Sequence, residues 1–292
     1  MSSDQSQRNR DTKKWAGIFL AAKVLVAGLM ILGGIGLLEA IWHNITSGFF
    51  SEEVRQHFNW GYAYANRGEN DKAIAEYSEA IRLHRDDAEA YHSRGLAYGK
   101  KGEYDKAIVD YSEAIRLNPN DAEAYYYRGL AYANKGEHDK PIADFSEAIR
   151  LNPKFAEAYY HRGVAYEKKG ERDKAIADCT EAIRLSPNDA KAYYGRGIAY
   201  GQKGESVKEI ADYNEAIRLN PSNAEAYCNR GLAYANKGET DKAITDFTEA
   251  IRLNPKLGTA YYARGTAYER KGRTSQAKAD FDRAAALGPE PK

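Results

Sequence analysis

The side chains of this sequence that could do recognition chemistry are tyrosines placed beside arginine and glycine. Residues 124–132 read AYYYRGLAY, and aromatic rings interleaved with a base can stack on nucleic-acid bases or on sugars. The formal net charge of the chain is only +1, so no bulk field draws it to nucleic acid or to anionic lipid. We therefore predict no nucleic-acid partner.

Patterns typical of catalytic or metal sites are missing from the sequence. The six histidines are scattered without metal-ligand spacing or a nucleophile partner, and no phosphate-binding GxxxxGK(S/T) motif occurs. Cys179 and Cys228 are too few for a disulfide framework or a cysteine-rich zinc site. We predict a chain that is not an enzyme and that needs no cofactor, no metal and no small-molecule substrate.

The tyrosines and glycines follow a strict period of 34 residues. One glycine series consists of Gly61, Gly95, Gly129, Gly163, Gly197, Gly231 and Gly265. The period divides residues 54–291 into seven contiguous repeats, numbered 1 to 7: 54–87, 88–121, 122–155, 156–189, 190–223, 224–257 and 258–291.

Each repeat is predicted to form two helices. In repeat 3 the first runs from Ala122 to Lys135 and stops at Gly136, a glycine suited to a left-handed C-cap. Asp139 is the candidate N-cap of the second helix, which ends before Pro153. Neither helix can bury its apolar face alone, so stacking between repeats must supply the core.

The repeat resembles a tetratricopeptide repeat. The resemblance rests on Tyr125-x2-Arg128-Gly129-x2-Tyr132, followed by Phe145, Ala148 and Pro153, and it covers residues 54–291. It implies an all-α fold, an α-solenoid in which seven helix-turn-helix repeats form a right-handed superhelix. It also implies that the first helices line a concave groove that binds peptides or partner proteins, without catalysis.

Arginine replaces the leucine usual in that family, and an acid follows each arginine after sixteen residues. The arginines are Arg94, Arg128, Arg162, Arg196, Arg230 and Arg264, and the acids are Asp110, Asp144, Asp178, Asp212, Asp246 and Asp280. We predict that each arginine pairs with this acid across the two helices of its repeat. A partly exposed pair of this kind contributes about 0–1 kcal/mol.

Three further departures concern packing. Cys179 occupies the aromatic position of repeat 4 and Glu209 the small-residue position of repeat 5, and we interpret both as drift in a redundant array. In repeat 7, Lys278 and Ala285 stand where the other repeats have isoleucine. This change predicts a polar end face, so that the last repeat caps a complete array.

One face of each first helix is the candidate partner-binding surface. Residues 123, 126, 130 and 133 share a face by helical spacing, and the resemblance makes that face the groove. The predicted residues, called the groove face below, are Tyr126, Leu130, Asn134, Tyr160, Val164, Lys168, Tyr194, Ile198, Gln202, Leu232 and Asn236. They suit an extended or helical segment with apolar anchors. Tyr127 lies at a variable neighbouring position, where we expect partner specificity.

A transmembrane anchor is predicted over residues 15–42, between a basic polar tail (1–14) and a linker (43–53). The nineteen residues from Val24 to Trp42 span about 28 Å as a helix, close to the thickness of a bilayer core. A cleaved signal peptide and a buried soluble helix are the alternatives. The sequence LEA at 38–40 makes a poor cleavage site.

The basic residues predict the orientation of this anchor. Four Lys or Arg residues precede the apolar run and only Arg55 lies in the fifteen residues after it. By the positive-inside rule the N-terminus lies in the cytoplasm and the repeats lie outside it, in the periplasm if the protein is bacterial, as we expect.

Three functions are compatible with these features. The favoured one is a single-pass, membrane-anchored scaffold that binds a protein segment in the groove. The second is a permanent accessory subunit of an envelope enzyme or assembly complex. The third and weakest is a glycan-binding module that uses the groove tyrosines.

Overall fold

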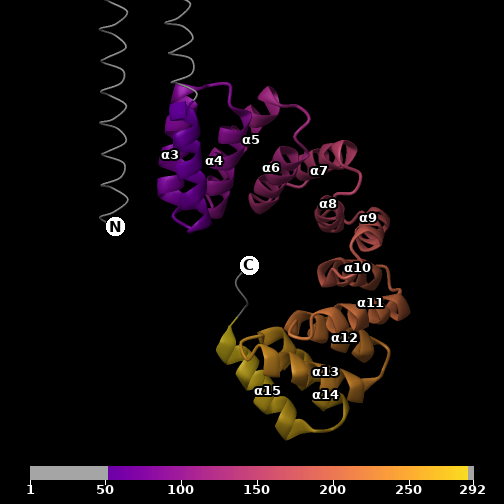
Figure 1. Ribbon diagram of the computed structural model, residues 1–292. Coiled ribbons are helices and arrows are strands. Elements are labelled where there is room, and N and C mark those ends of the chain that lie inside the picture. The colour runs from indigo at the N-terminus through magenta and orange to yellow at the C-terminus, as the bar shows by residue number, and fades with distance from the viewer. Residues whose placement is uncertain (1–51, 289–292) are drawn as a thin grey trace, which may run out of the picture. The chain divides into compact units, whose positions relative to one another are not determined.

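The computed structural model describes residues 52–288, and all regular structure in that range is helical (Figure 1). Residues 52–66 form the first described helix. It is followed by α3 (Asn70–Leu83), α4 (Ala88–Lys100), α5 (Tyr104–Leu117), α6 (Ala122–Asn134), α7 (Asp139–Leu151), α8 (Ala156–Lys168), α9 (Arg172–Leu185), α10 (Ala190–Gln202), α11 (Ser206–Leu219), α12 (Ala224–Asn236), α13 (Thr240–Leu253), α14 (Gly258–Arg270) and α15 (Thr274–Leu287). The prediction of an all-α fold built from helix pairs is confirmed.

The predicted N-terminal tail (1–14), the anchor (15–42) and most of the linker (43–53) lie outside the described residues. Between residues 52 and 288, no helix combines the length and the hydropathy that crossing a membrane requires.

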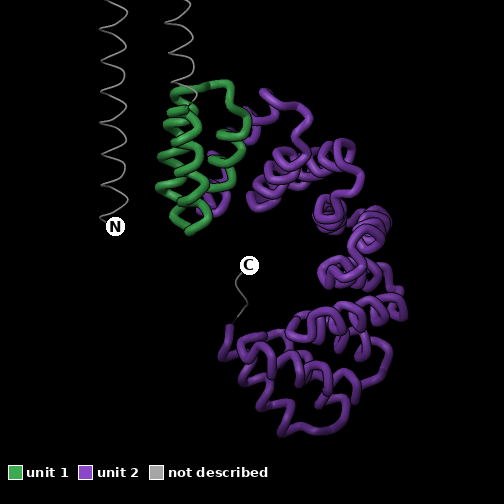
Figure 2. The backbone as a smooth tube through the Cα atoms, in the orientation of Figure 1, with its two compact units in different colours: residues 1–97 green, residues 98–292 purple. Residues whose placement is uncertain are grey.

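The chain divides into two compact units, residues 1–97 and residues 98–292, with the boundary inside α4 (Figure 2). In the N-terminal unit, Tyr77 of α3 packs with Tyr64 of the first helix and with Ala97 of α4. The C-terminal unit holds every residue of the groove face.

Helices of the C-terminal unit stack in chain order, and Figure 2 shows that this unit follows an arc. Each second helix packs against the first helix of its own repeat and against the first helix of the next. Consecutive first helices also contact one another, from α6 through α8, α10 and α12 to α14. In the described part of this unit no such contact joins consecutive second helices. The first helices therefore line the inner side of the curve.

Small residues let the two helices of a repeat approach closely. In repeat 3, a Cβ placed on Gly129 of α6 would lie 2.8 Å from the ring of Phe145 of α7, which is 1% exposed. Ala124 and Ala148 are fully buried beside them. Gly136 has a φ of 79°, a conformation that glycine adopts without strain, so the predicted left-handed glycine is confirmed. The helix itself ends at Asn134 and its C-cap is Lys135, one residue earlier than predicted.

The predicted N-cap of α7 is wrong by one residue. The N-cap is His138, whose side chain makes no capping hydrogen bond, and Asp139 is the first helical residue. Its carboxylate instead accepts a hydrogen bond from Lys169 Nζ of the next repeat at 2.6 Å. Asp139 thus joins two repeats rather than closing the end of its own helix. The same pairing recurs in Lys135–Asp105, Lys203–Asp173 and Lys271–Asp241.

The end of the array differs from the predicted polar cap. Lys278 is exposed as expected, but Ala285 lines an apolar hollow of about 940 Å³ together with Leu232, Tyr262 and Phe281. Lys278 and Ala285 stand where the other repeats have isoleucine, and α15 leaves the rings of Tyr262 and Phe281 partly exposed. The interpretation of the last repeat as its own cap is wrong at this hollow.

Candidate functional site

Five of the six predicted arginine–aspartate pairs are confirmed. Arg128 Nε donates to Asp144 Oδ2 at 2.9 Å and Arg128 Nη2 donates to Oδ1 at 2.7 Å, a bidentate arrangement. The same two bonds join Arg162 with Asp178, Arg196 with Asp212, Arg230 with Asp246 and Arg264 with Asp280. The pair of Arg94 with Asp110 would join the two units and stays a prediction.

The acids of these pairs are buried, so the estimate for a partly exposed pair does not describe what happens when one partner is removed. The Asp144 side chain is 8% exposed and that of Arg128 is 20% exposed. Breaking a buried pair by removing one partner costs about 3–5 kcal/mol, since it strands the other charge. The pairs are therefore part of the repeat core.

Each arginine also contacts the preceding repeat, a feature that sequence analysis missed. Arg128 Nη1 donates to Ser112 Oγ of α5 at 3.1 Å, and the guanidinium lies 5.5 Å from the ring centroid of Tyr125. Equivalent bonds run from Arg162 to Ser146, Arg196 to Thr180, Arg230 to Asn214 and Arg264 to Thr248. A hydroxyl or amide sixteen residues before each arginine was the available signal. These bonds fix the rotation of each first helix and hence the direction of its groove face.

The residues of the groove face differ in exposure. Its apolar members Leu130, Val164 and Ile198 are half-buried, and Leu232 is 42% exposed. Its polar members Asn134, Lys168, Gln202 and Asn236 are all exposed. Because consecutive first helices touch, the aliphatic positions follow one another from repeat to repeat, and so do the positions of the amides and the lysine.

The three tyrosines of the groove face are not equivalent. Tyr126 is 8% exposed, and its ring centroid lies 4.7 Å from that of Phe155 and 5.7 Å from that of His161. Tyr160 and Tyr194 stay half-exposed. Tyr126 is thus mainly a core residue, and fewer tyrosine rings remain free for a glycan than the sequence suggested.

The residue that precedes each first helix decides whether the preceding tyrosine is covered. Asp189 and Asn223 cap α10 and α12 through their side chains, whereas Phe155 precedes α8 and makes no such cap. A capping side chain contributes about 1 kcal/mol, so α8 gives up that stabilisation while Phe155 buries Tyr126. The open part of the groove face therefore runs from Tyr160 to Leu232.

Comparison with known families agrees with this architecture. The model described as "TPR repeat" matches residues 61–102, 100–136 and 134–170. Models described as "Tetratricopeptide repeat" match residues 156–189, 190–223, 224–257 and 258–290. The chain belongs to the tetratricopeptide repeat family. Proteins of this family are generally non-catalytic interaction scaffolds.

Solved tetratricopeptide structures share the fold of this chain. MamA is 31% identical, with a TM-score of 0.51 over 55% of this chain and 93% of MamA. YrrB, described as a TPR protein with an unusual peptide-binding site, is 24% identical, with a TM-score of 0.55 over 64% of this chain and 97% of YrrB. A tetratricopeptide repeat protein from Parabacteroides merdae ATCC 43184 is 19% identical, with a TM-score of 0.66 over 82% of this chain and 94% of that protein. The last two likenesses concern the fold alone.

No curated protein sequence matches this tetratricopeptide chain. Within residues 52–288, no three His, Cys, Asp or Glu side chains are grouped as a metal ion would require. The absence of a metal, of a cofactor and of catalysis stays a prediction.

The variable position of Tyr127 takes part in packing between repeats. Each residue at this tetratricopeptide position contacts the repeat before it: the Tyr127 ring stacks 6.1 Å from that of Tyr111, and that of His161 lies 6.0 Å from Phe145. Asn229 Nδ2 donates to Tyr194 Oη at 2.9 Å. The side chain at this position thus varies with its neighbour in the preceding repeat, and partner specificity here stays a prediction.

His161 should make the stability of this tetratricopeptide array depend on pH. Burial, followed by the charge of Lys191, lowers the pKa of His161 from 6.5 to about 4. As the pH falls, the imidazole of His161 is therefore protonated in the unfolded chain before it is protonated in the folded chain. Its contribution is complete above pH 6.5 and is lost as the pH falls toward 4. Between pH 7 and pH 4.5 the wild type should lose roughly 2–3 kcal/mol more than His161→Phe, which urea unfolding at both pH values measures. Equal losses would contradict the assignment.

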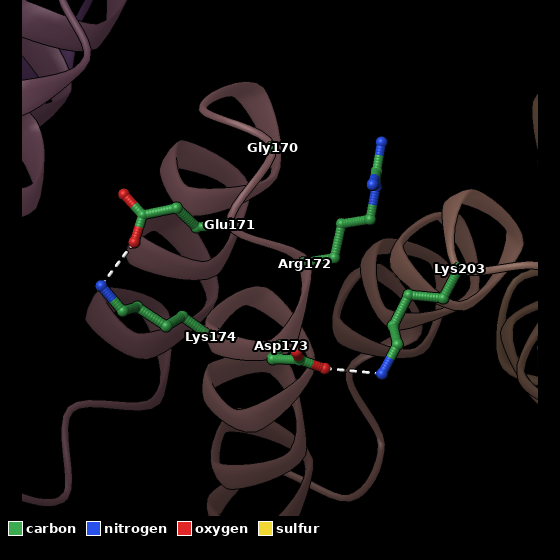
Figure 3. Close-up of a pocket in the computed structure, with 6 residues that line it drawn as sticks. All are labelled: Gly170, Glu171, Arg172, Asp173, Lys174 and Lys203. Atoms are coloured by element: carbon green, nitrogen blue, oxygen red, sulfur yellow. Dashed lines mark hydrogen bonds and ion pairs between the residues drawn. The ribbon is translucent and has the colours of Figure 1, made fainter.

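A second hollow, of about 390 Å³, lies at the tetratricopeptide turn between α8 and α9 (Figure 3). Its charged side chains neutralise one another: Asp173 accepts from Lys203 at 2.6 Å, and Glu171 accepts from Lys174. Figure 3 shows the Arg172 side chain pointing away from the Asp173–Lys203 pair. Its Nε donates to Gln202 at 3.4 Å. Without an apolar floor, this hollow is a weaker candidate site than the groove face.

Proposed function

We propose that this chain is a non-catalytic, membrane-anchored scaffold whose groove face binds a segment of a partner protein. The observation that carries the proposal is the row formed by Leu130, Val164, Ile198 and Leu232, one aliphatic side chain per repeat on helices that touch. Rigid, concave and partly apolar surfaces are the usual places for ligand binding. Membership of a family of interaction scaffolds supports the same function.

The partner segment should carry apolar anchors rather than charge. The aliphatic row is flanked by Asn134, Lys168, Gln202 and Asn236, which contribute a single positive charge. Asn134 Nδ2 already donates to its own helix at Leu130 O, at 2.9 Å, so its amide oxygen remains to accept from a partner. An extended or helical peptide with aliphatic or aromatic side chains at intervals matching the repeats fits this chemistry.

Charge inserted into the row should abolish partner binding. We expect Val164→Glu or Ile198→Glu to lower the capture of partners by a photoreactive residue at Tyr160 at least about ten-fold in cells, since a carboxylate would have to be desolvated on docking. Val109→Glu is the matched control, because Val109 is 67% exposed on the second helix α5. Capture that Val164→Glu and Val109→Glu reduce equally would overturn the proposal.

The membrane anchor and the orientation belong to the same proposal. They are supported by the apolar run at residues 15–42 and by the excess of Lys and Arg before it. Reporter fusions after Lys292 test the placement. Activity of a periplasmic reporter is expected, and activity of a cytoplasmic reporter in its place would contradict it.

The apolar hollow at the end of the array favours one alternative. A permanent accessory subunit should expose such a surface, and the purified chain should then associate with itself or aggregate when its partner is missing. A monomeric and stable chain supports the scaffold function.

A further inference from the structure

The end face of repeat 7 exposes apolar side chains more than the same positions of the earlier repeats in the C-terminal unit. Tyr262 is 63% exposed, whereas Tyr126 at the same position of repeat 3 is 8% exposed. Phe281 is half-buried, whereas Phe145 is 1% exposed. Ala285 is exposed and lines the hollow of about 940 Å³ with them.

The existing junctions show what such a covering helix must carry. Over repeat 3, Phe155 packs on Tyr126 and Ala158 is fully buried. Arg162 Nη1 donates to Ser146 Oγ at 3.0 Å. Over repeat 6, Leu257, Ala260 and Arg264 take the same places, and Arg264 Nη1 donates to Thr248 Oγ1 at 3.1 Å. These two junctions share a bulky apolar residue, a small residue three positions later and an arginine four positions after that. The other junctions of the C-terminal unit keep the small residue and the arginine but have Asp121, Asp189 or Asn223 at the first place.

The residue that accepts from the arginine changes character in repeat 7. In the junctions of the C-terminal unit it is neutral: Ser112, Ser146, Thr180, Asn214 and Thr248. In repeat 7 it is Asp282, which α15 holds in the same register and leaves exposed. Within residues 52–288 no basic side chain forms an ion pair with Asp282. A carboxylate at this place accepts a charge-assisted hydrogen bond from an arginine, which is stronger than the neutral bond it replaces.

We propose that this end face binds an amphipathic helix of a partner protein, one that carries the bulky–small–arginine pattern and places its arginine on Asp282. The partner helix takes the position of a further first helix and buries Tyr262, Phe281 and Ala285. A second copy of this chain stacked head to tail does not fit, because its first repeat has Glu53, Gln56 and Trp60 at the three places. This end face shares only Leu232 with the groove face, so binding here does not require the groove function.

A peptide taken from this chain supplies a defined probe. Residues 154–169 (KFAEAYYHRGVAYEKK) contain the pattern as Phe155, Ala158 and Arg162. A helix-stapled, fluorescent form should bind the full chain in detergent, as anisotropy measures. Asp282→Lys should weaken binding at least about ten-fold, whereas Asp282→Ser should weaken it only about three-fold, because serine is the acceptor used by repeat 3.

Charge reversal distinguishes the ion pair from a general effect of Asp282. The peptide with Arg162→Glu should bind the wild type poorly and recover on Asp282→Lys. Val164→Glu in the full chain, tested with the unchanged peptide, should leave the affinity unchanged. This result would separate the end face from the groove function. Asp282 is exposed, so circular dichroism should show no loss of helix in either variant.

Four outcomes would overturn the inference. They are no binding of the peptide, equal affinity for wild type and Asp282→Lys, loss of binding on Val164→Glu, and a dimer of the full chain that Ala285→Arg dissociates. The last would assign the face to a second copy of the chain.

Discussion

Replacing Asp144 with alanine should lower the free energy of unfolding by about 3–5 kcal/mol. The substitution leaves Arg128, only 20% exposed, without the carboxylate that receives two of its hydrogen bonds. Arginine cannot shed its charge in a protein, so the guanidinium must stay poorly solvated or pull away from Ser112 and Tyr125. Either response loosens the contact between repeats 2 and 3 as well as repeat 3 itself.

Glu147→Ala is the matched control for this prediction. Glu147 lies three residues later on α7 and pairs with Arg150 at 2.6 Å, but the Arg150 side chain is 63% exposed. Removing this pair should cost at most about 0.5 kcal/mol. Urea unfolding of the two variants, followed by circular dichroism, measures the difference. Equal costs would show that the buried pair contributes no more than a surface pair.

The Arg–Asp pairs also show which features of the structure could be predicted from the sequence. A constant spacing of sixteen residues was enough to predict the pairing, because helix geometry and the period fix which side chains face each other. Burial of the acids was not predictable in the same way. It depends on how closely the two helices of a repeat pack, since Asp280 of the last described repeat is as buried as Asp144.

The groove face was predictable as a face but not in its exposure. Helical spacing placed Tyr126, Tyr160 and Tyr194 alike. Phe155, Asp189 and Asn223, which precede the following first helices, then make them different. The signal was present as one apolar residue among polar caps. The effect of this residue on exposure depends on whether the segment before a first helix passes over the tyrosine of the preceding repeat. That path is set by the packing of the repeats.

Repeat 4 contains a second solution to the same packing problem. Cys179 stands where repeat 3 has Phe145. It is 1% exposed, so the smaller side chain does not open the core to solvent. Opposite it stands Gly195 where repeat 4 itself has His161. A Cβ on Gly195 would lie 3.2 Å from the ring of Tyr160 and 3.5 Å from Cys179 Sγ. The tyrosine ring therefore fills the space that a phenylalanine and a larger neighbour occupy elsewhere, and the interpretation of Cys179 as isolated drift is incomplete.

Transferring this solution to repeat 3 should show coupling between positions sixteen residues apart. Phe145→Cys alone should cost about 2–4 kcal/mol, because Tyr126 is held by Phe155 and His161 and cannot swing into the cavity. His161→Gly alone should cost about 1 kcal/mol or more through lost helix propensity and lost packing. In the double variant the ring of Tyr126 gains the room that Tyr160 has. The cost of the double variant should then fall below the sum of the single costs by at least about 1 kcal/mol.

Urea unfolding of the four proteins in the cycle measures this coupling. Phe145→Cys/His138→Gly is the control, because His138 is exposed at the α6–α7 turn. Strictly additive costs would mean that Cys179 and Gly195 arose independently. A coupling of the expected sign would show that each junction of the array is a matched set of side chains.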